Sequence, residues 1–231
     1  MSPPFPPVEP EPTEVVFPPP ENADDEGVVA VGSDFRPGTL LAAYREGIFP
    51  WPHGVRGRPG HVVFWFSPER RALFSLADTP HWSRSLRRTL RKTPFRVTHD
   101  TAFEAVMKAC GDTRPTGTWI IPPVLRGYSL LHEHGFAHSV EVWDGTELVG
   151  GIYGIAVGAS FAGESMFHLR DDASKIAFCH LVDRLRAQRF DFLDVQVLNP
   201  HLASLGCVEV DRAEFLQRLR TSRERPCRFG D

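Results

Sequence analysis

Hydrophobic and polar positions alternate with two different periods along the chain, and the change of period outlines the secondary structure. Apolar residues spaced three and four apart predict helices, whereas short apolar runs rich in Val, Ile and Phe predict strands. The clearest helix is predicted at 172–188, where Phe178, Leu181, Val182 and Leu185 form one face. Further helices are predicted at 39–46, 80–92, 101–110 and 122–134, and strands at 28–32, 62–68, 137–143, 147–157, 159–165 and 190–199.

Turn and capping residues indicate where several of these elements begin and end. Asp144-Gly145 is a strong hairpin signal between two strands. The apolar GIFPW at 47–51 is predicted to be a turn. Other predicted features are a capping box of Thr101 with Glu104, an Asn199 cap on a short helix, an edge strand at CVEV, and a last helix begun by Asp211 with Glu214.

The order of these elements predicts the fold class. A helix, a hairpin, a further strand, a helix and another strand follow one another in the second half of the chain. This order favours an α+β fold on a mainly antiparallel sheet. Residues 1–16 are rich in Pro and Glu and are predicted to be a disordered or polyproline-like tail. A boundary near residue 70 would separate a small N-terminal domain, 17–70, from a larger domain, 71–231.

The strand at 190–199 carries the first candidate chemistry. Side chains alternate along a strand, so Phe190, Phe192, Asp194, Gln196 and Leu198 are predicted to share one face. That places a carboxylate and an amide on an otherwise apolar surface. Because a buried carboxylate is costly without partners, the pair is either satisfied structurally or directed into a functional site.

The helix predicted at 80–92 has two opposed faces. Arg84, Arg88 and Arg91 lie along one side, and the opposite side is apolar, formed by Trp82, Leu86 and Leu90. Few acidic residues lie between the arginines to neutralise them. The ridge is either an ordinary solvated face or a contact surface for a phosphate backbone.

Composition narrows the class of protein. The chain of 231 residues is 42% hydrophobic and 24% charged, which is typical of a globular protein. We expect no membrane span, since no apolar run approaches the roughly 20 residues required, and we see no secretion signal. The four scattered cysteines favour reduced thiols in a cytoplasmic protein, and the net charge of −3 argues against indiscriminate nucleic-acid binding.

Three other functions are compared with the sequence: a metal site, an acyl-CoA N-acetyltransferase and an RNA-binding module. His132, His134 and His138 resemble a ligand cluster, but their spacing matches no zinc signature. An acyl-CoA N-acetyltransferase would cradle pyrophosphate in a Gly-rich turn, whereas the turn here, MFHLRDDASK at 166–175, is acidic and lacks glycine. A non-catalytic RNA-binding module would use the arginine ridge and exposed tryptophans.

Long colinear strings then identify a family. They are LLAAYREGIFPW, FWFSPERRA, GTWI, HGFAHSVEVW, ELVGGIYGIAVG, FAGESMF, ASK and LDVQVLNPHLASLG. From about residue 17 to residue 220, the chain resembles bacterial leucyl/phenylalanyl-tRNA–protein transferases. The resemblance implies transfer of Leu, Phe or sometimes Met from aminoacyl-tRNA to proteins with an N-terminal Arg or Lys, which creates a degradation signal. It also implies an acetyltransferase-like (GNAT-like) C-terminal domain, no cofactor and no metal.

The resemblance also implies roles for individual residues. Trp51 and Trp119 would hold the terminal adenosine of the tRNA, and Glu164 would bond near the reacting ester. Arg84, Arg88 and Arg91 would contact phosphates of the acceptor stem. The side chain of the transferred amino acid would enter an apolar pocket formed by Ile152, Phe161, Met166, Phe178, Leu181, Leu185 and Leu193.

The chemical step leaves two accounts open. In the first, Gln196 accepts a hydrogen bond from the attacking amine and Asp194 orients or polarises that amine. In the second, a ribose hydroxyl of the tRNA shuttles the proton and the two residues only position substrates. The donor preference also stays open, because Ile152, Phe178, Leu181 and Leu185 depart from the family's usual apolar residues. We expect a monomer, since the core helices leave no surplus apolar stripe.

Overall fold

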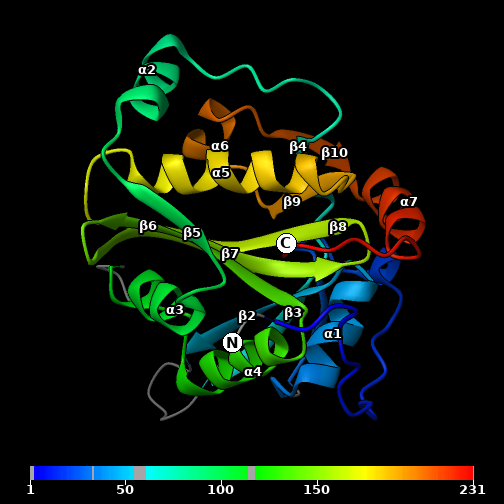
Figure 1. Cartoon of the computed structure of the whole chain (residues 1–231). Coiled ribbons are helices and arrows are strands. Elements are labelled where there is room, and N and C mark those ends of the chain that lie inside the picture. The colour runs from blue at the N-terminus through cyan, green and yellow to red at the C-terminus, as the bar shows by residue number, and fades with distance from the viewer. Residues whose placement is uncertain (1–2, 33, 55–60, 114–117, 231) are drawn as a thin grey trace.

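The computed structural model of the protein describes residues 3–32, 34–54, 61–113 and 118–230, and it contains two sheets (Figure 1). The smaller sheet has the strand order β1-β3-β2 and comprises β1 (Val28–Val31), β2 (Phe49–Gly54) and β3 (His61–Phe66). The larger sheet has the order β10-β4-β9-β8-β7-β6-β5. Its strands are β4 (Arg70–Ser75), β5 (Arg96–His99), β6 (Ala137–Asp144), β7 (Glu147–Val157), β8 (Ser160–His168), β9 (Phe192–Gln196) and β10 (Val208–Asp211).

Helices cover both faces of the larger sheet. They are α1 (Pro37–Arg45), α2 (Arg84–Lys92), α3 (Phe103–Asp112), α4 (Pro122–Glu133), α5 (Ala173–Ala187), α6 (Pro200–Ser204) and α7 (Arg212–Ser222), with a short 3-10 turn at Pro20–Asn22. Figure 1 shows α5 above the central strands and α3 and α4 below them. The residues of β7 alternate accordingly: Ile152 packs in the cluster beneath α5, and Tyr153 packs in the cluster beside α3 and α4.

Strand pairing confirms the predicted fold class. All neighbouring strands of both sheets are antiparallel except β8 and β9, which are parallel. The predicted hairpin at Asp144-Gly145 joins β6 to β7, and Asn199 caps α6 by accepting a hydrogen bond from the Leu202 backbone N–H at 2.9 Å. β10 is the predicted edge strand. The protein is therefore an α+β protein with a mainly antiparallel sheet.

Several predicted boundaries were wrong. The helix predicted from residue 80 begins at Arg84, because the Ser83 hydroxyl caps it by accepting from the Leu86 N–H at 3.1 Å. The predicted turn at 47–51 instead enters β2, which pairs with β3. β4 was not predicted, since its two leading arginines give no strand pattern.

The predicted capping box at α3 does not form. The helix follows Ala102, which makes no side-chain cap, and the Thr101 hydroxyl donates to Glu141 at 2.8 Å. Glu104 instead pairs with Lys108. Glu141 is fully buried, and a buried carboxylate is costly without hydrogen-bond donors. The Thr101 hydroxyl therefore bonds to Glu141 instead of capping the helix. Asp211 does precede α7, although its side chain makes no capping bond.

The segment before the first strand lies against the helices. The Val8 N–H donates to the His134 carbonyl at 2.8 Å, and Glu9 pairs with Arg45 at 2.6 Å. The Thr13 and Thr39 hydroxyls are 2.8 Å apart. Described residues 3–16 contain neither a helix nor a strand.

The division predicted near residue 70 coincides with the change from one sheet to the other. However, a single apolar cluster includes Leu40 and Trp65 from before that point together with Tyr128 and Tyr153 from after it. The core is therefore continuous across the two sheets. Among the helices of the described ranges, none is both long enough and apolar enough to cross a membrane.

Candidate functional site

The two faces of β9 look toward different surroundings. Leu193 and Val195 pack in the large apolar cluster beneath α5. Phe192 packs in a smaller cluster with Phe215 of α7, and Asp194 extends from the same side. Because side chains alternate along a strand, consecutive residues of β9 face these two different surroundings.

Phe192 and Asp194 share a face as predicted, but the predicted five-residue face was wrong for the other three residues. Gln196 has φ of +65°, a left-handed backbone that ends the alternation. Phe190 and Leu198, predicted on the side of Asp194, pack with the opposite cluster. The physical reason is that β9 is only five residues long, so its ends are free of the pleat.

Asp194 forms a buried ion pair with Arg71 of β4. Arg71 Nε donates to Oδ1 at 2.9 Å and Nη2 donates to Oδ2 at 2.7 Å, and the two residues are 1% and 4% exposed. The guanidinium lies between the rings of Phe49 and Phe215, 4.7 and 4.4 Å from their centroids. The carboxylate also accepts from the Gln196 backbone N–H at 2.9 Å. Asp194 thus holds both Arg71 and the irregular backbone at Gln196.

The Gln196 side chain connects to a second carboxyl group, which is partly buried. Its Nε2 donates to Oε1 of Glu164 on β8 at 2.7 Å. The Tyr128 hydroxyl donates to the other Glu164 oxygen at 3.2 Å, and the Tyr44 hydroxyl hydrogen-bonds to that of Tyr128. Because Glu164 accepts from the amide nitrogen, the orientation of Gln196 is set, and its Oε1 accepts no hydrogen bond from the described residues.

Burial changes the acidity of this network. It raises the pKa of Glu164 to about 7, against a usual value of 4.5. Burial likewise raises the pKa values of Tyr44 and Tyr128 well above the usual value of a tyrosine. Glu164 is therefore a carboxyl group able to gain or lose a proton near neutral pH.

The residues predicted to hold adenosine lie next to this network. Trp51, Trp119, Glu164 and Gln196 line one cavity of about 90 Å³, together with Phe49 and Pro50. Trp51 lies on β2, where the flanking prolines offer no N–H to a further strand, and it is 39% exposed. Trp119 meets Tyr128 edge to face at 6.2 Å. Four predicted site residues from well separated parts of the chain are thus brought together.

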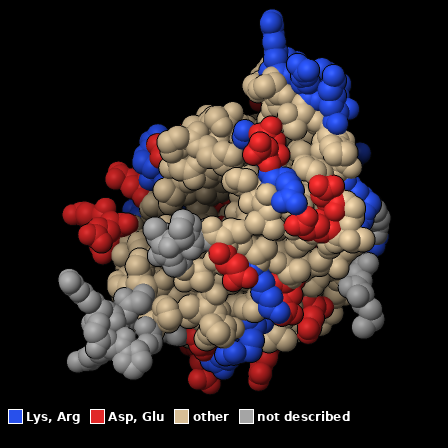
Figure 2. Space-filling model, turned by 90° about the vertical axis from the view of Figure 1, so that its left-hand side faces the viewer, with Lys and Arg blue, Asp and Glu red and all other residues tan. Residues whose placement is uncertain are grey.

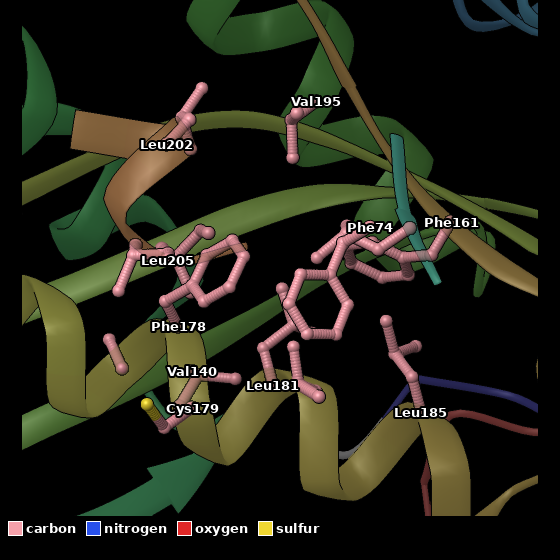
Figure 3. Packing of buried hydrophobic residues seen from close by; sticks show 14 of the residues in the cluster. Phe74, Val140, Phe161, Phe178, Cys179, Leu181, Leu185, Val195, Leu202 and Leu205 are labelled. Carbon is pink, nitrogen blue, oxygen red and sulfur yellow. The ribbon is translucent and has the colours of Figure 1, made fainter. Parts of the chain in front are cut away.

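The predicted pocket residues also come together. Ile152, Phe161, Phe178, Leu181, Leu185 and Leu193 belong to one buried cluster, and Met166 packs against it. Figure 3 shows several of them converging from α5 and the sheet. Pairing between β8 and β9 ends at Ala162 and Asp194, beside this cluster, although both strands continue. Their use as a binding pocket stays a prediction.

The basic helix, α2, packs on the same apolar cluster. α2 has the sequence RSLRRTLRK, with no acidic residue, and its Leu86 and Leu90 pack on the apolar cluster. Figure 2 shows Lys and Arg gathered on α2 at the top of one face, above a hollow surrounded mainly by uncharged residues. Arg84, Arg88 and Arg91 are thus exposed on a helix that docks against the cluster.

The three histidines of HEHGFAH hydrogen-bond to different partners, although His132 Nδ1 also lies 3.9 Å from Asp100, the partner of His138. His132 Nδ1 bonds to the Ala137 carbonyl, His134 Nδ1 to the Val8 carbonyl, and His138 Nδ1 to Asp100, at 2.8, 2.8 and 2.9 Å. Within the described ranges, no group of three or more His, Cys, Asp or Glu residues could hold a metal ion.

Arg71, Tyr44 and Tyr128 were missed by the sequence analysis. Arg71 lies at the start of a strand that was not predicted. Both tyrosines lie on the buried apolar faces of their helices, where the pattern indicates only core packing. One signal was available, because a tyrosine on a buried face needs a hydrogen-bond partner for its hydroxyl. The identity of that partner depends on the fold.

Comparison with known proteins identifies the family. The model of the leucyl/phenylalanyl-tRNA protein transferase family matches residues 74–220, and that of its N-terminal domain matches residues 33–69. Leucyl/phenylalanyl-tRNA–protein transferases from Shewanella denitrificans and Myxococcus xanthus are 49% and 47% identical to the chain. These alignments cover 85% and 93% of this chain, and 82% and 91% of the relatives.

Two solved structures have a weaker likeness. A conserved protein of unknown function from Staphylococcus epidermidis has a TM-score of 0.41 at 11% identity, covering 62% of this chain and 57% of that one. The C-terminal domain of a protein named as a lysylphosphatidylglycerol synthetase from Agrobacterium fabrum has a TM-score of 0.40 at 12% identity, covering 81% and 59%. We base no argument on these two structures. The two family models and the curated relatives confirm the resemblance predicted from the sequence strings, and the chain belongs to the leucyl/phenylalanyl-tRNA–protein transferase family of aminoacyltransferases.

Proposed function

We propose that this protein transfers Leu or Phe, and sometimes Met, from aminoacyl-tRNA to the α-amino group of proteins that begin with Arg or Lys. The observation that carries the proposal is the cavity in which Trp51 and Trp119 adjoin the Glu164–Gln196 pair. Aromatic rings that can hold a nucleoside thus lie beside groups that can handle a proton. The product would carry a new N-terminal residue that marks it for degradation.

The donor would be held at three places. Trp51 stacks on the terminal adenosine, an interaction worth about 1–3 kcal/mol. The aminoacyl side chain enters the apolar cluster between α5 and the sheet. Arg84, Arg88 and Arg91 bind phosphates of the acceptor stem, which positions the RNA without reading its sequence.

The reaction is aminolysis of an ester that is already activated. The amine nitrogen bonds to the ester carbonyl carbon, the bond to the ribose oxygen breaks, and the proton lost by the amine ends on that oxygen. An α-amino group has a pKa near 7.7–8.0, so an appreciable fraction is neutral at cytoplasmic pH. The enzyme therefore needs to supply proximity and proton handling rather than a strong base.

Gln196 and Asp194 take different parts in this proposal. The Gln196 Oε1 accepts a hydrogen bond from the attacking amine, since its Nε2 is held by Glu164. Asp194 acts on the amine through Gln196, because its own oxygens bond to Arg71 and to the Gln196 backbone. The rival account, in which a ribose hydroxyl shuttles the proton, leaves both residues as positioning groups.

We also propose that residues 71–231 form an acetyltransferase-like domain in which the aminoacyl-adenosine end of the tRNA takes the position of a coenzyme. Residues 17–70 would form a small N-terminal domain that supplies Trp51. Support comes from the change of sheet near residue 70 and from the parallel β8–β9 pair beside the cavity. We propose that the protein acts as a cytoplasmic monomer.

The decisive experiment mixes the purified protein with radiolabelled Leu-tRNA or Phe-tRNA and a peptide that begins with Arg. Label should appear in this peptide and in one beginning with Lys, but not in a matched peptide beginning with Ala. Binding of the tRNA without transfer would instead favour the RNA-binding module and withdraw the roles given to Asp194 and Gln196. A parallel reaction with labelled acetyl-CoA tests the acetyltransferase alternative, and labelled peptide there would contradict the proposal.

A further inference from the structure

The chain beyond α7 returns to the large apolar cluster. Arg225 pairs with Asp191 and donates to the Arg189 carbonyl at 2.8 Å, which ties this C-terminal segment to the connection between α5 and β9. Phe229 follows and is only 2% exposed, as a member of the cluster that contains the predicted donor pocket. It lies outside residues 74–220, the part matched by the family model.

Phe229 is held firmly in place. Its ring stacks on Phe161 at 5.4 Å with an interplanar angle of 24°, and on His138 at 4.4 Å with an angle of 20°. The Arg184 Nε donates to the Phe229 carbonyl at 2.6 Å, and the Gln188 Nε2 donates to the Gly230 carbonyl at 3.3 Å. Figure 3 shows the C-terminal segment passing near the end of the cluster where Phe161 and Leu185 lie.

Phe161 has little freedom on its other sides. A Cβ on Gly154 of the neighbouring strand would collide with the Phe161 ring, so that ring already occupies the space above β7. Phe190 meets it edge to face at 6.3 Å. Phe229 also lines a surface cavity of about 610 Å³ that Phe161 does not reach. Phe229 therefore lies between Phe161 and this surface cavity.

We propose that Phe229 is a positioning residue that sets the depth of the donor pocket through Phe161, and thereby the preference between Leu and Phe donors. The inference rests on the proposed function, in which Phe161 lines the pocket for the aminoacyl side chain. Close packing transmits the position of one ring to the next. Small changes in pocket volume alter selectivity by about 10–200-fold.

The test measures kcat/KM for Phe-tRNA and for Leu-tRNA with an Arg peptide. Phe229→Ala removes the support behind Phe161, so the pocket deepens and the larger donor gains. We expect the ratio of kcat/KM for Phe-tRNA to that for Leu-tRNA to rise about tenfold. Phe229→Leu keeps an apolar contact, so the ratio should change less, and this variant provides the test if Phe229→Ala does not fold.

A matched control separates pocket shape from lost stability. Met107 is fully buried in the other cluster, so Met107→Ala should lower the melting temperature while leaving the donor ratio unchanged. In a Phe161→Ala background, Phe229→Ala should have no further effect on the ratio, since the residue through which it acts is gone.

Two results would overturn the inference. One is a ratio within twofold of wild type in a folded Phe229 variant, and the other is an equal change in Met107→Ala. Failure of the proposed function looks different, because the wild-type protein would then label the Arg peptide from neither donor.

Discussion

The two sides of β9 differ in how their residues depend on one another. On one side Leu193 and Val195 belong to a large cluster of buried apolar side chains. On the other side Asp194, Arg71 and Gln196 form a chain of specific bonds that continues through Glu164 to Tyr128. Loss of one member of a bonded network leaves a buried polar group unpaired, whereas an apolar cluster adapts by degrees. We therefore expect rate to depend on the network and donor choice on the cluster.

Asp194→Ala should give the largest effect on the network side. It removes the partner of the buried Arg71 guanidinium, which we expect to cost about 3–5 kcal/mol of stability. The transfer rate should fall about 10²–10⁴-fold, measured by single-turnover kinetics under conditions where the variant is folded.

A paired variant separates these two losses. Arg71→Met with Asp194→Leu replaces the ion pair by apolar contacts and should recover most of the stability but not the rate. A rate loss below tenfold in folded Asp194→Ala would leave Asp194 with a structural role only. It would also contradict the expectation that the transfer rate depends on the bonded side of β9.

Glu164→Gln tests the proton held by the network. The pKa of Glu164 in the folded protein is about 7, above the usual 4.5, so the folded state retains a proton that the unfolded chain releases. This contribution is fully present below pH 4.5 and is lost as the pH rises through 7. Wild-type stability should fall by roughly 3 kcal/mol across that window, at 1.36 kcal/mol per pH unit. Urea unfolding at several pH values should show a flatter profile for the variant, and identical profiles would contradict the shift.

Trp51→Ala tests the cavity wall next to the network. We expect affinity for aminoacyl-tRNA to fall by about 1–3 kcal/mol, because a stacked base loses its partner. Trp51→Phe keeps an aromatic face and should lose less. The measurement is equilibrium binding of Phe-tRNA at one stated salt concentration, and equal affinities for all three proteins would remove Trp51 from the donor site.

Arg88→Glu should have the smallest effect and the least bearing on chemistry. Binding of tRNA should weaken, and the slope of log K against log salt should fall by about one, since one phosphate contact is lost. The ratio of Phe to Leu transfer should stay constant. Arg218→Glu on α7, where Arg218 pairs with Glu214, is the matched control and should leave the salt slope unchanged.

Patterns within the chain predicted the elements with strong local signals. The β6–β7 hairpin, α4, α5 and the Asn199 cap follow from residues close together in the sequence, and the structure contains all of them. The colinear strings also identified the family correctly. What failed depended on neighbours: β4 was missed, and the Thr101 capping box was displaced by the buried Glu141.

The sequence alone determined the fold class, the family and the residue types available for chemistry, because periodicity and long strings are properties of the chain itself. Only the tertiary structure decided which groups meet. Arg71 and Asp194 are separated by 123 residues, and Gln196 and Glu164 by 32. Whether a buried carboxyl is paired, and how far burial raises the pKa of another, depends on distances that arise only after the sheet has assembled.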